Sequence, residues 1–129
     1  MASVTEFQVT FDCAEPARVA QFWCEVLGYV LPPSAEGETD WSAAVDPSGV
    51  GPRLFFQRVP EGKVAKNRVH LDVRVGAGLV GEERLAALES ACARLVPLGA
   101  VRGQLLLADE ENESCLNMQD VEGNEFCLD

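Results

Sequence analysis

The stretch QVTFDCAEPARVAQFWCEVLG, residues 8–28, joins an alternating segment to an amphipathic one and ends in glycine. The second half repeats this order, from His70-Leu-Asp-Val73 through another apolar stripe to Leu98-Gly99. Each half then reaches an Asp-x-x-Gly turn, at residues 46–49 and 120–123, and a further strand. A strand–helix–strands unit that occurs twice in tandem predicts two modules that bury their apolar faces jointly.

Apolar periodicity predicts where the helices and strands lie. Helical spacing between Val19 and Leu27 predicts a first helix that Pro16 opens and Gly28 ends. A second helical stripe runs from Leu85 to Val96. Alternation predicts strands over residues 4–12 and 69–75, and further strands fall near 41–45, 53–59, 100–107, 114–119 and 124–128. The polar residues 60–67 are the expected link between modules at about 1–60 and 67–129.

The composition excludes several classes of function. The chain has 129 residues and a net charge of -11, which argues against nucleic acid and against an anionic membrane surface as partners. No apolar run approaches the ~20 residues of a membrane span, and the beginning of the sequence lacks a signal-peptide pattern. The five cysteines are widely spaced and form no C-x-x-C motif. We therefore expect one cytoplasmic domain with reduced thiols.

The predicted strands each have an apolar and a polar face. The polar faces pair Gln8 with Thr10, Arg53 with Gln57, His70 with Asp72, and Glu125 with Cys127. In one interpretation these faces meet bulk water, as in many antiparallel sheets. In the other the sheet curves so that they line a cavity, which the tandem arrangement favours.

Four segments in this order resemble the vicinal oxygen chelate superfamily, which includes glyoxalase I, extradiol dioxygenases and bleomycin-resistance proteins. They are residues 11–18 (FDCAEPAR), 22–28 (FWCEVLG), 67–72 (NRVHLD) and 120–127 (DVEGNEFC). The chain looks like a glyoxalase-like domain of that superfamily. The resemblance implies an α+β fold in which two tandem βαβββ modules form a curved, partly open mixed sheet around a central groove. It also implies a small-molecule ligand and a homodimer.

The resemblance further implies where a metal would bind. Metal-dependent members of the superfamily take one ligand from each of four strands. The matching positions here are Gln8, His70 and Cys127, with Glu125, two residues earlier on the same face, as the alternative to Cys127. The fourth position falls on Phe55 or Arg53, depending on which glycine is aligned, and neither is a metal ligand. A divalent ion such as Zn, Ni, Mn or Fe could therefore be held by three residues, or the groove could function without metal.

The candidate catalytic residues are His70 and Glu125. His70 is the only histidine, and Asp72 could orient its ring so that it acts as a general base; the alternative is a histidine satisfied by hydrogen bonds. Glu125 could carry a proton, or it could form an ion pair with Arg53 or Arg74. Cys127 could be a metal thiolate, a nucleophile or a buried inert thiol, and the sequence has no second histidine to activate it as a nucleophile.

The remaining candidates are expected to contact a ligand. Trp41, Arg53, Phe55 and Asp72 form this substrate-binding set, and Trp41 could stack on a planar molecule or pack in the core. Three functions stay open: a lyase, isomerase or dioxygenase; a metal-free protein that sequesters a small molecule; and a degenerate member that binds a partner chain. The missing fourth ligand favours the second function, and the polar segments at residues 70–72 and 123–127 favour the first.

Overall fold

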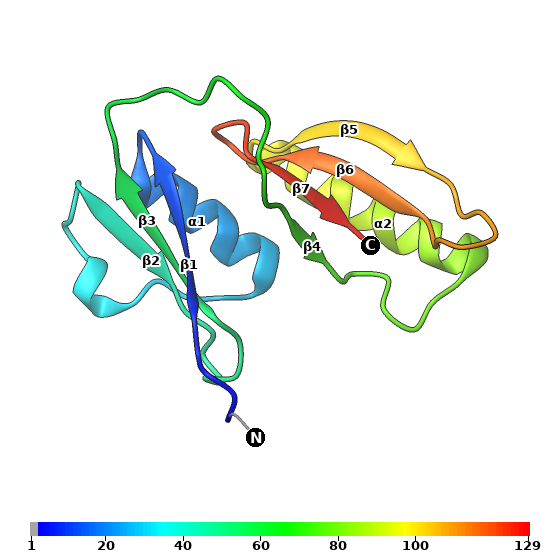
Figure 1. Ribbon diagram of the computed structural model, residues 1–129, viewed down its shortest axis with the longest axis horizontal. Coiled ribbons are helices and arrows are strands. Elements are labelled where there is room, and N and C mark those ends of the chain that lie inside the picture. Colours follow the sequence, from blue (N-terminus) through cyan, green and yellow to red (C-terminus); the bar gives the residue numbers. More distant parts are fainter. Residues whose placement is uncertain (1–2) are drawn as a thin grey trace. The chain divides into compact units, whose positions relative to one another are not determined.

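The chain folds into two compact units, the first ending at Gly62 and the second covering Lys63–Asp129 (Figure 1). The computed structural model describes residues 3–129, so the first two residues of the expected first module lie outside it. None of the helices formed by the described residues is long and apolar enough to cross a membrane.

The first unit is a three-stranded mixed sheet with one long helix. Its elements are β1 (Gln8–Cys13), α1 (Pro16–Leu27), the short 3-10 helix η1 (Pro33–Ala35), β2 (Trp41–Ala44) and β3 (Arg53–Arg58). The strand order is β1-β3-β2, with β1 parallel and β2 antiparallel to β3. An isolated antiparallel bridge between Val30 and Val45 extends the edge beside β2.

The first helix forms where the sequence predicts it. Pro16 occupies the first turn, and Gly28 ends the helix at φ 72°, in the left-handed conformation that glycine adopts without strain. The apolar stripe is buried against the sheet, with Trp23 only 1% exposed. The ring of Phe11, from β1, lies 5.3 Å from that of Trp23 and 5.1 Å from that of Phe56. This aromatic cluster is the core of the unit, as expected for Trp23.

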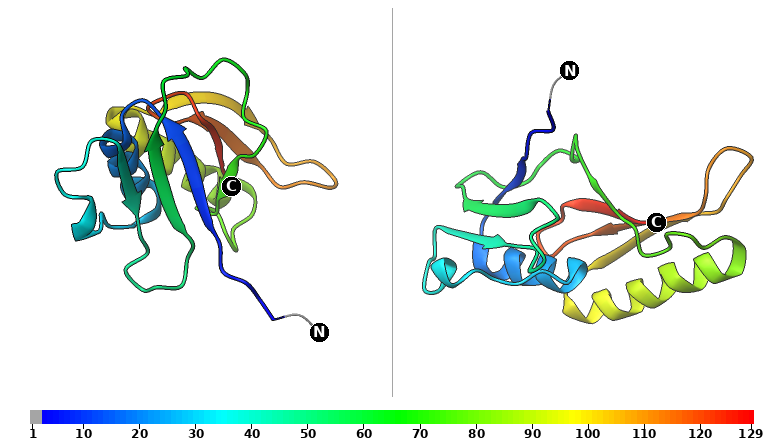
Figure 2. Two further views of the ribbon diagram at one scale, coloured as in Figure 1. Left: turned by 60° about the vertical axis from the view of Figure 1, so that its left-hand side comes forward. Right: turned by 90° about the horizontal axis from the view of Figure 1, so that it is seen from below.

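The second unit repeats this plan with one more strand. Its elements are β4 (Leu71–Val73), α2 (Gly81–Leu95), the 3-10 helix η2 (Val96–Leu98), β5 (Val101–Leu106), β6 (Cys115–Gln119) and β7 (Glu125–Leu128). The strand order is β4-β7-β6-β5, with β4 parallel to β7 and the other pairs antiparallel. In both units the first strand therefore runs parallel to the last, and one helix covers one face of the sheet (Figure 2).

Three elements differ clearly in extent from the sequence prediction. The strand expected over 4–12 begins only at Gln8, because its pairing with β3 starts there, and Phe7 is 69% exposed. The strand expected over 69–75 is limited to Leu71–Val73, because only these three residues pair with β7. Val69 is 76% exposed. The second helix begins at Gly81, before its apolar stripe, and Glu82 and Glu83 lie in its first turn, where the helix dipole favours negative charge.

The predicted α+β class and the tandem repeat are confirmed. The two Asp-x-x-Gly turns are built alike: Asp46 accepts hydrogen bonds from Ser48 and Gly51, and Asp120 accepts them from Glu122 and Asn124. Each unit has its own mixed sheet, and within the described residues neither sheet closes into a barrel.

Candidate functional site

The side chains of interest in the second unit lie on the sheet face that α2 leaves uncovered, here called the open face. Strand alternation turns Phe126 and Leu128 toward α2, where they are at most 1% exposed. Glu125 and Cys127 therefore lie on the open face. The register places Asp72 opposite Cys127 on one side and Asn117 opposite it on the other.

A cavity of about 270 Å³ lies over the open face. His70, Asn117, Gln119, Glu125 and Cys127 contribute to its wall, together with Lys66 from the segment that precedes β4. Most of these side chains carry amide, imidazole, carboxylate or thiol groups. The cavity is therefore polar enough to orient a ligand by hydrogen bonds.

His70, Asp72 and Cys127 form a cluster of three potential metal ligands at this cavity. One donor atom from each lies within 4.8 Å of the other two. His70 Nε2 is 3.1 Å from Asp72 Oδ1, and these side chains are 50% and 42% exposed. His70 comes directly before β4, and Asp72 lies within it. Because side chains two residues apart in an extended segment point to the same side, the imidazole and the carboxylate lie on the same face.

The thiol of Cys127 is held in its protonated form. Burial, together with the smaller effect of the nearby Asp72 carboxylate, raises the pKa of Cys127 to about 11. The thiol donates a hydrogen bond to Asn117 Oδ1 at 3.1 Å. Without a metal ion, Cys127 is therefore a poor nucleophile, as expected for an inert thiol.

The donor chemistry of this cluster fits a divalent metal ion with affinity for sulfur. In a tetrahedral zinc site, ligands at 2.0–2.3 Å from the metal lie roughly 3.3–3.8 Å from one another. The three donor atoms here are at most 4.8 Å apart, so side-chain rotations that move each atom by about an ångström bring them to that spacing. A fourth position would remain for water or a ligand oxygen.

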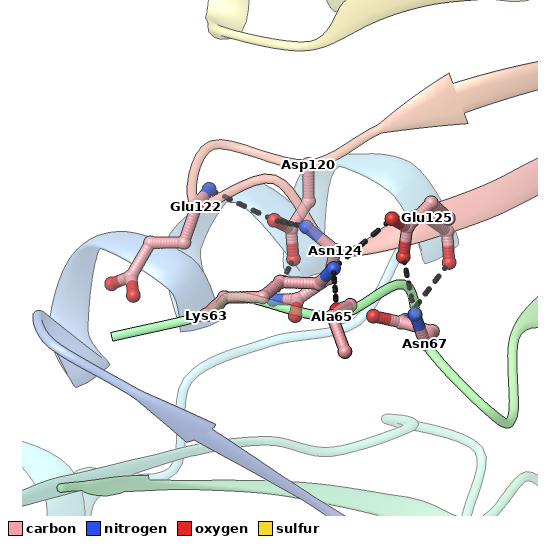
Figure 3. Close-up of polar contacts among 7 residues, drawn as sticks. All are labelled: Lys63, Ala65, Asn67, Asp120, Glu122, Asn124 and Glu125. Carbon is pink, nitrogen blue, oxygen red and sulfur yellow. Dashed lines mark hydrogen bonds and ion pairs between the residues drawn. The ribbon is translucent and has the colours of Figure 1, made fainter. Parts of the chain in front are cut away.

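Glu125 is engaged by the segment that leads to β4 (Figure 3). Its Oε1 accepts a hydrogen bond from Lys63 Nζ at 3.0 Å, and its Oε2 accepts one from the backbone N–H of Asn67 at 2.9 Å. Burial raises the pKa of Glu125, but the hydrogen bonds from Asn67 and Lys63 outweigh burial and lower it below the ordinary value. The ion-pair partner of Glu125 in the structure is therefore Lys63, rather than the expected Arg53 or Arg74.

The turn before β7 fixes the place of Glu125. Asp120 is only 1% exposed, and its Oδ1 accepts hydrogen bonds from the backbone N–H groups of Glu122 at 2.8 Å and Asn124 at 2.9 Å. Its Oδ2 accepts a third from Asn124 Nδ2, as Figure 3 shows. This buried carboxylate closes the turn at Gly123, whose φ is 84°, and β7 begins two residues later.

The first unit has an open face of a different kind. Trp41 and Phe55 are stacked at 5.6 Å with an interplanar angle of 10°, and the Arg53 guanidinium lies 5.3 Å from the centre of the Phe55 ring. Arg53 and Phe55 were alternatives in the alignment of the two halves, but both lie on this face because they are two residues apart on β3. Trp41 is half-buried within the stack.

Gln8 lies on the same face of the first unit and is already hydrogen-bonded. Its Oε1 accepts a bond from Arg53 Nη1 at 3.3 Å, and its Nε2 donates to Thr10 Oγ1 at 3.4 Å. The oxygen that would bind a metal therefore has a guanidinium beside it, which disfavours a cation at that position.

The sequence candidates thus fall into two groups in the structure. His70, Asp72, Glu125 and Cys127 come together on the second unit, and Trp41, Arg53, Phe55 and Gln8 come together on the first. Sequence reasoning missed Asn117, Lys63 and Asn67. The alternation of β6 could have placed Asn117 on the open face, but no sequence signal indicates that the segment 63–67 returns to Glu125.

Comparisons with solved structures show the same fold. A glyoxalase/bleomycin resistance protein/dioxygenase family enzyme from Burkholderia phytofirmans PsJN superimposes with a TM-score of 0.71 at 12% identity, covering 94% of each chain. A mutant of the fosfomycin resistance protein FosX from Listeria monocytogenes, complexed with Mn(II) and 1S,2S-dihydroxypropylphosphonic acid, gives 0.71 at 10% identity and covers 99% of this chain and 90% of that one. A possible glyoxalase from Bacillus cereus gives 0.66 at 13% identity, covering 98% of each chain.

No curated protein sequence matches the chain. The family model of the glyoxalase-like domain, however, matches residues 8–128, which include both open faces and both helices. This match and the structural neighbours confirm the resemblance seen in the four sequence segments. The chain belongs to the glyoxalase-like domain family, within the vicinal oxygen chelate superfamily.

Proposed function

We propose that the protein binds a small oxygen-containing molecule in the cavity of its second unit, beside a divalent metal ion held by His70, Asp72 and Cys127. The observation that carries the proposal is that His70 and Cys127 belong both to the ligand cluster and to the cavity wall. The cavity volume of about 270 Å³ lies just below the ~300–1,000 Å³ of sites for drug-sized ligands, so the occupant is small.

Zn²⁺ is the metal that this donor set favours. Thiolate and imidazole ligands select zinc, whereas manganese, which the FosX neighbour holds, prefers oxygen ligands. When bound, the ion would act as a Lewis acid on oxygen atoms of the ligand. Zn²⁺ has no redox chemistry, so the proposed reaction class is that of a lyase or isomerase rather than a dioxygenase.

The residues around the cavity have different roles in this proposal. Asn117 and Gln119 line the cavity and can orient a ligand through their side-chain amides. His70 can serve as a metal ligand through one nitrogen, and as a general base only in the metal-free protein. Glu125 is not proposed as a proton carrier, because both of its carboxylate oxygens already accept hydrogen bonds.

The test is metal content and affinity in the untagged protein. We expect about one equivalent of Zn²⁺ by inductively coupled plasma mass spectrometry, and its loss in His70→Ala and Asp72→Ala. Asp12→Ala is the matched control, because Asp12 is an exposed carboxylate on the first strand of the other unit. Gln8→Ala should also retain the metal. Wild-type protein that takes up no zinc, nickel or manganese after loading would overturn the proposed metal site.

A second candidate function, metal-free binding of a planar compound, is favoured by the stacked rings of Trp41 and Phe55. A planar ligand could continue this stack, and Arg53 could supply a counter-charge to an anionic group on it. This is the chemistry of a sequestering protein rather than an enzyme.

Tryptophan fluorescence tests this second candidate. We expect 2-naphthoate, a planar aromatic carboxylate, to quench the emission of Trp41 with saturation, while the buried Trp23 gives a constant background. Arg53→Gln should weaken binding about tenfold if the charge pairs with the carboxylate. Arg58→Gln, at the exposed end of the same strand, is the control. Linear quenching that is unchanged in Trp41→Leu would rule the candidate out.

A further inference from the structure

The segment from Lys63 to His70 reaches the cavity without regular secondary structure of its own. Neither a helix nor a strand is formed between β3 and β4, yet Lys66 and His70 both contribute to the cavity wall. Ordering the backbone of one residue costs roughly 1–2 kcal/mol, so an irregular segment of this length needs specific contacts to hold one position.

Those contacts converge on one residue, Glu125. The Glu125 side chain accepts hydrogen bonds from Lys63 Nζ at 3.0 Å and from the backbone N–H of Asn67 at 2.9 Å. The backbone carbonyl of Glu125 accepts a further hydrogen bond from Asn67 Nδ2 at 3.3 Å (Figure 3). Lys63 Nζ also donates to the carbonyl of Ala65 at 2.8 Å, which folds the start of the segment onto itself. The Lys63–Glu125 pair is partly shielded, with side chains 27% and 24% exposed.

We propose that Glu125 is a positioning residue: through Lys63 and Asn67 it fixes the segment 63–70 so that His70 meets Asp72 and Cys127. Asn67 precedes His70 by three residues, and its backbone N–H is held by Glu125. Because three residues span only a short distance, this contact limits where the imidazole of His70 can lie. Glu125 is itself held by the turn that the buried Asp120 closes. The inference rests on the proposed metal site. In it, Glu125 positions the segment and does not carry a proton.

The chemistry predicts a graded effect of substitutions. Glu125→Gln keeps the size of the side chain but removes the charge that attracts Lys63. Lys63 and Asn67 donate to different carboxylate oxygens, and the amide replaces one of these acceptors with an NH₂ donor. Loss of a residue that orients a metal ligand typically weakens metal binding about 10–100-fold. We therefore expect roughly tenfold weaker Co²⁺ binding in Glu125→Gln and in Lys63→Met than in the wild type. Lys63→Arg keeps the positive charge and should bind Co²⁺ almost as tightly as the wild type.

Two measurements on the intact chain of 129 residues test the inference. The first is Co²⁺ affinity from the absorption of the bound ion, with Glu110→Gln in the exposed 109–113 loop as a control of equal charge change. The second is hydrogen exchange of the Asn67 amide, which should be protected in the wild type and exchange faster in Glu125→Gln without added metal. Circular dichroism and thermal unfolding establish that each variant is folded.

The outcomes separate this inference from the proposed function. If wild-type protein binds no Co²⁺ but the Asn67 amide is protected only when Glu125 is intact, the metal site fails and the positioning contact stands. If wild-type protein binds Co²⁺ and Glu125→Gln binds it equally tightly, with the same Asn67 exchange rate, the positioning role of Glu125 is overturned. Weaker Co²⁺ binding in both Glu125→Gln and Glu110→Gln would reduce the effect to net charge and would also overturn it.

Discussion

Replacement of Cys127 by serine is expected to weaken Zn²⁺ binding by at least about 100-fold, because loss of a direct ligand costs more than loss of a residue that only orients one. It should also change the pH dependence. Burial raises the pKa of Cys127 to about 11, so zinc must displace a proton from the thiol at any pH below that value. The apparent affinity of the wild type should therefore gain about a factor of ten per pH unit from Cys127 alone.

The sign of this dependence distinguishes a thiolate ligand from a bystander. Lowering the pH restores the thiol proton and releases zinc. In Cys127→Ser, the slope of log affinity against pH should therefore be smaller by about one than in the wild type. The measurement is competition with a chromophoric chelator between about pH 6.5 and 8.5, a range that lies below the pKa of Cys127, so that zinc must displace the thiol proton throughout. Cys24→Ser is a matched control, since burial raises the pKa of the Cys24 thiol to about 11 as well, but Cys24 lies in α1. An unchanged slope in Cys127→Ser would contradict direct ligation by sulfur.

Replacement of Arg84 by alanine is expected to lower the free energy of unfolding by roughly 2–4 kcal/mol. The Arg84 side chain is only 7% exposed. Its Nε and Nη2 donate to the carbonyl of Ser114 at 3.1 and 2.9 Å, and its Nη1 donates to the carbonyl of Gly76 at 3.1 Å. One side chain of α2 therefore joins the residues just after β4 to the residue just before β6. Its removal leaves two carbonyl groups without these bonds and a cavity beside them.

Urea denaturation of the purified variants checks this prediction. Arg84→Met fills most of the volume and should recover part of the loss, because only the hydrogen bonds are then missing. Arg68→Ala is the control, since Arg68 is exposed in the segment before β4, and its stability should equal that of the wild type within error. If Arg84→Ala matches Arg68→Ala, the buried guanidinium does not stabilise the unit as its contacts imply.

The helices and the strand pattern could be predicted from the sequence because they depend on local periodicity. Pro16, Gly28 and the stripe around Trp23 define α1 almost to the residue. The strand over 69–75 was predicted too long, since alternation cannot tell how many residues find a partner in β7. The homodimer and the cytoplasmic location expected from the sequence stay predictions.

By itself, the sequence determined the α+β class, the tandem repeat, the family and the face on which each polar side chain lies, because strand alternation and helical spacing are properties of neighbouring residues. The contact between His70 and Asp72, two residues apart, also follows from alternation, but only the tertiary structure decided which polar residues from different segments meet. Strand register brings Asp72 and Asn117 to Cys127, and an irregular segment returns Lys63 and Asn67 to Glu125. Such pairings join residues up to 62 positions apart, and long-range contacts of this kind follow from how packed elements are placed rather than from local pattern.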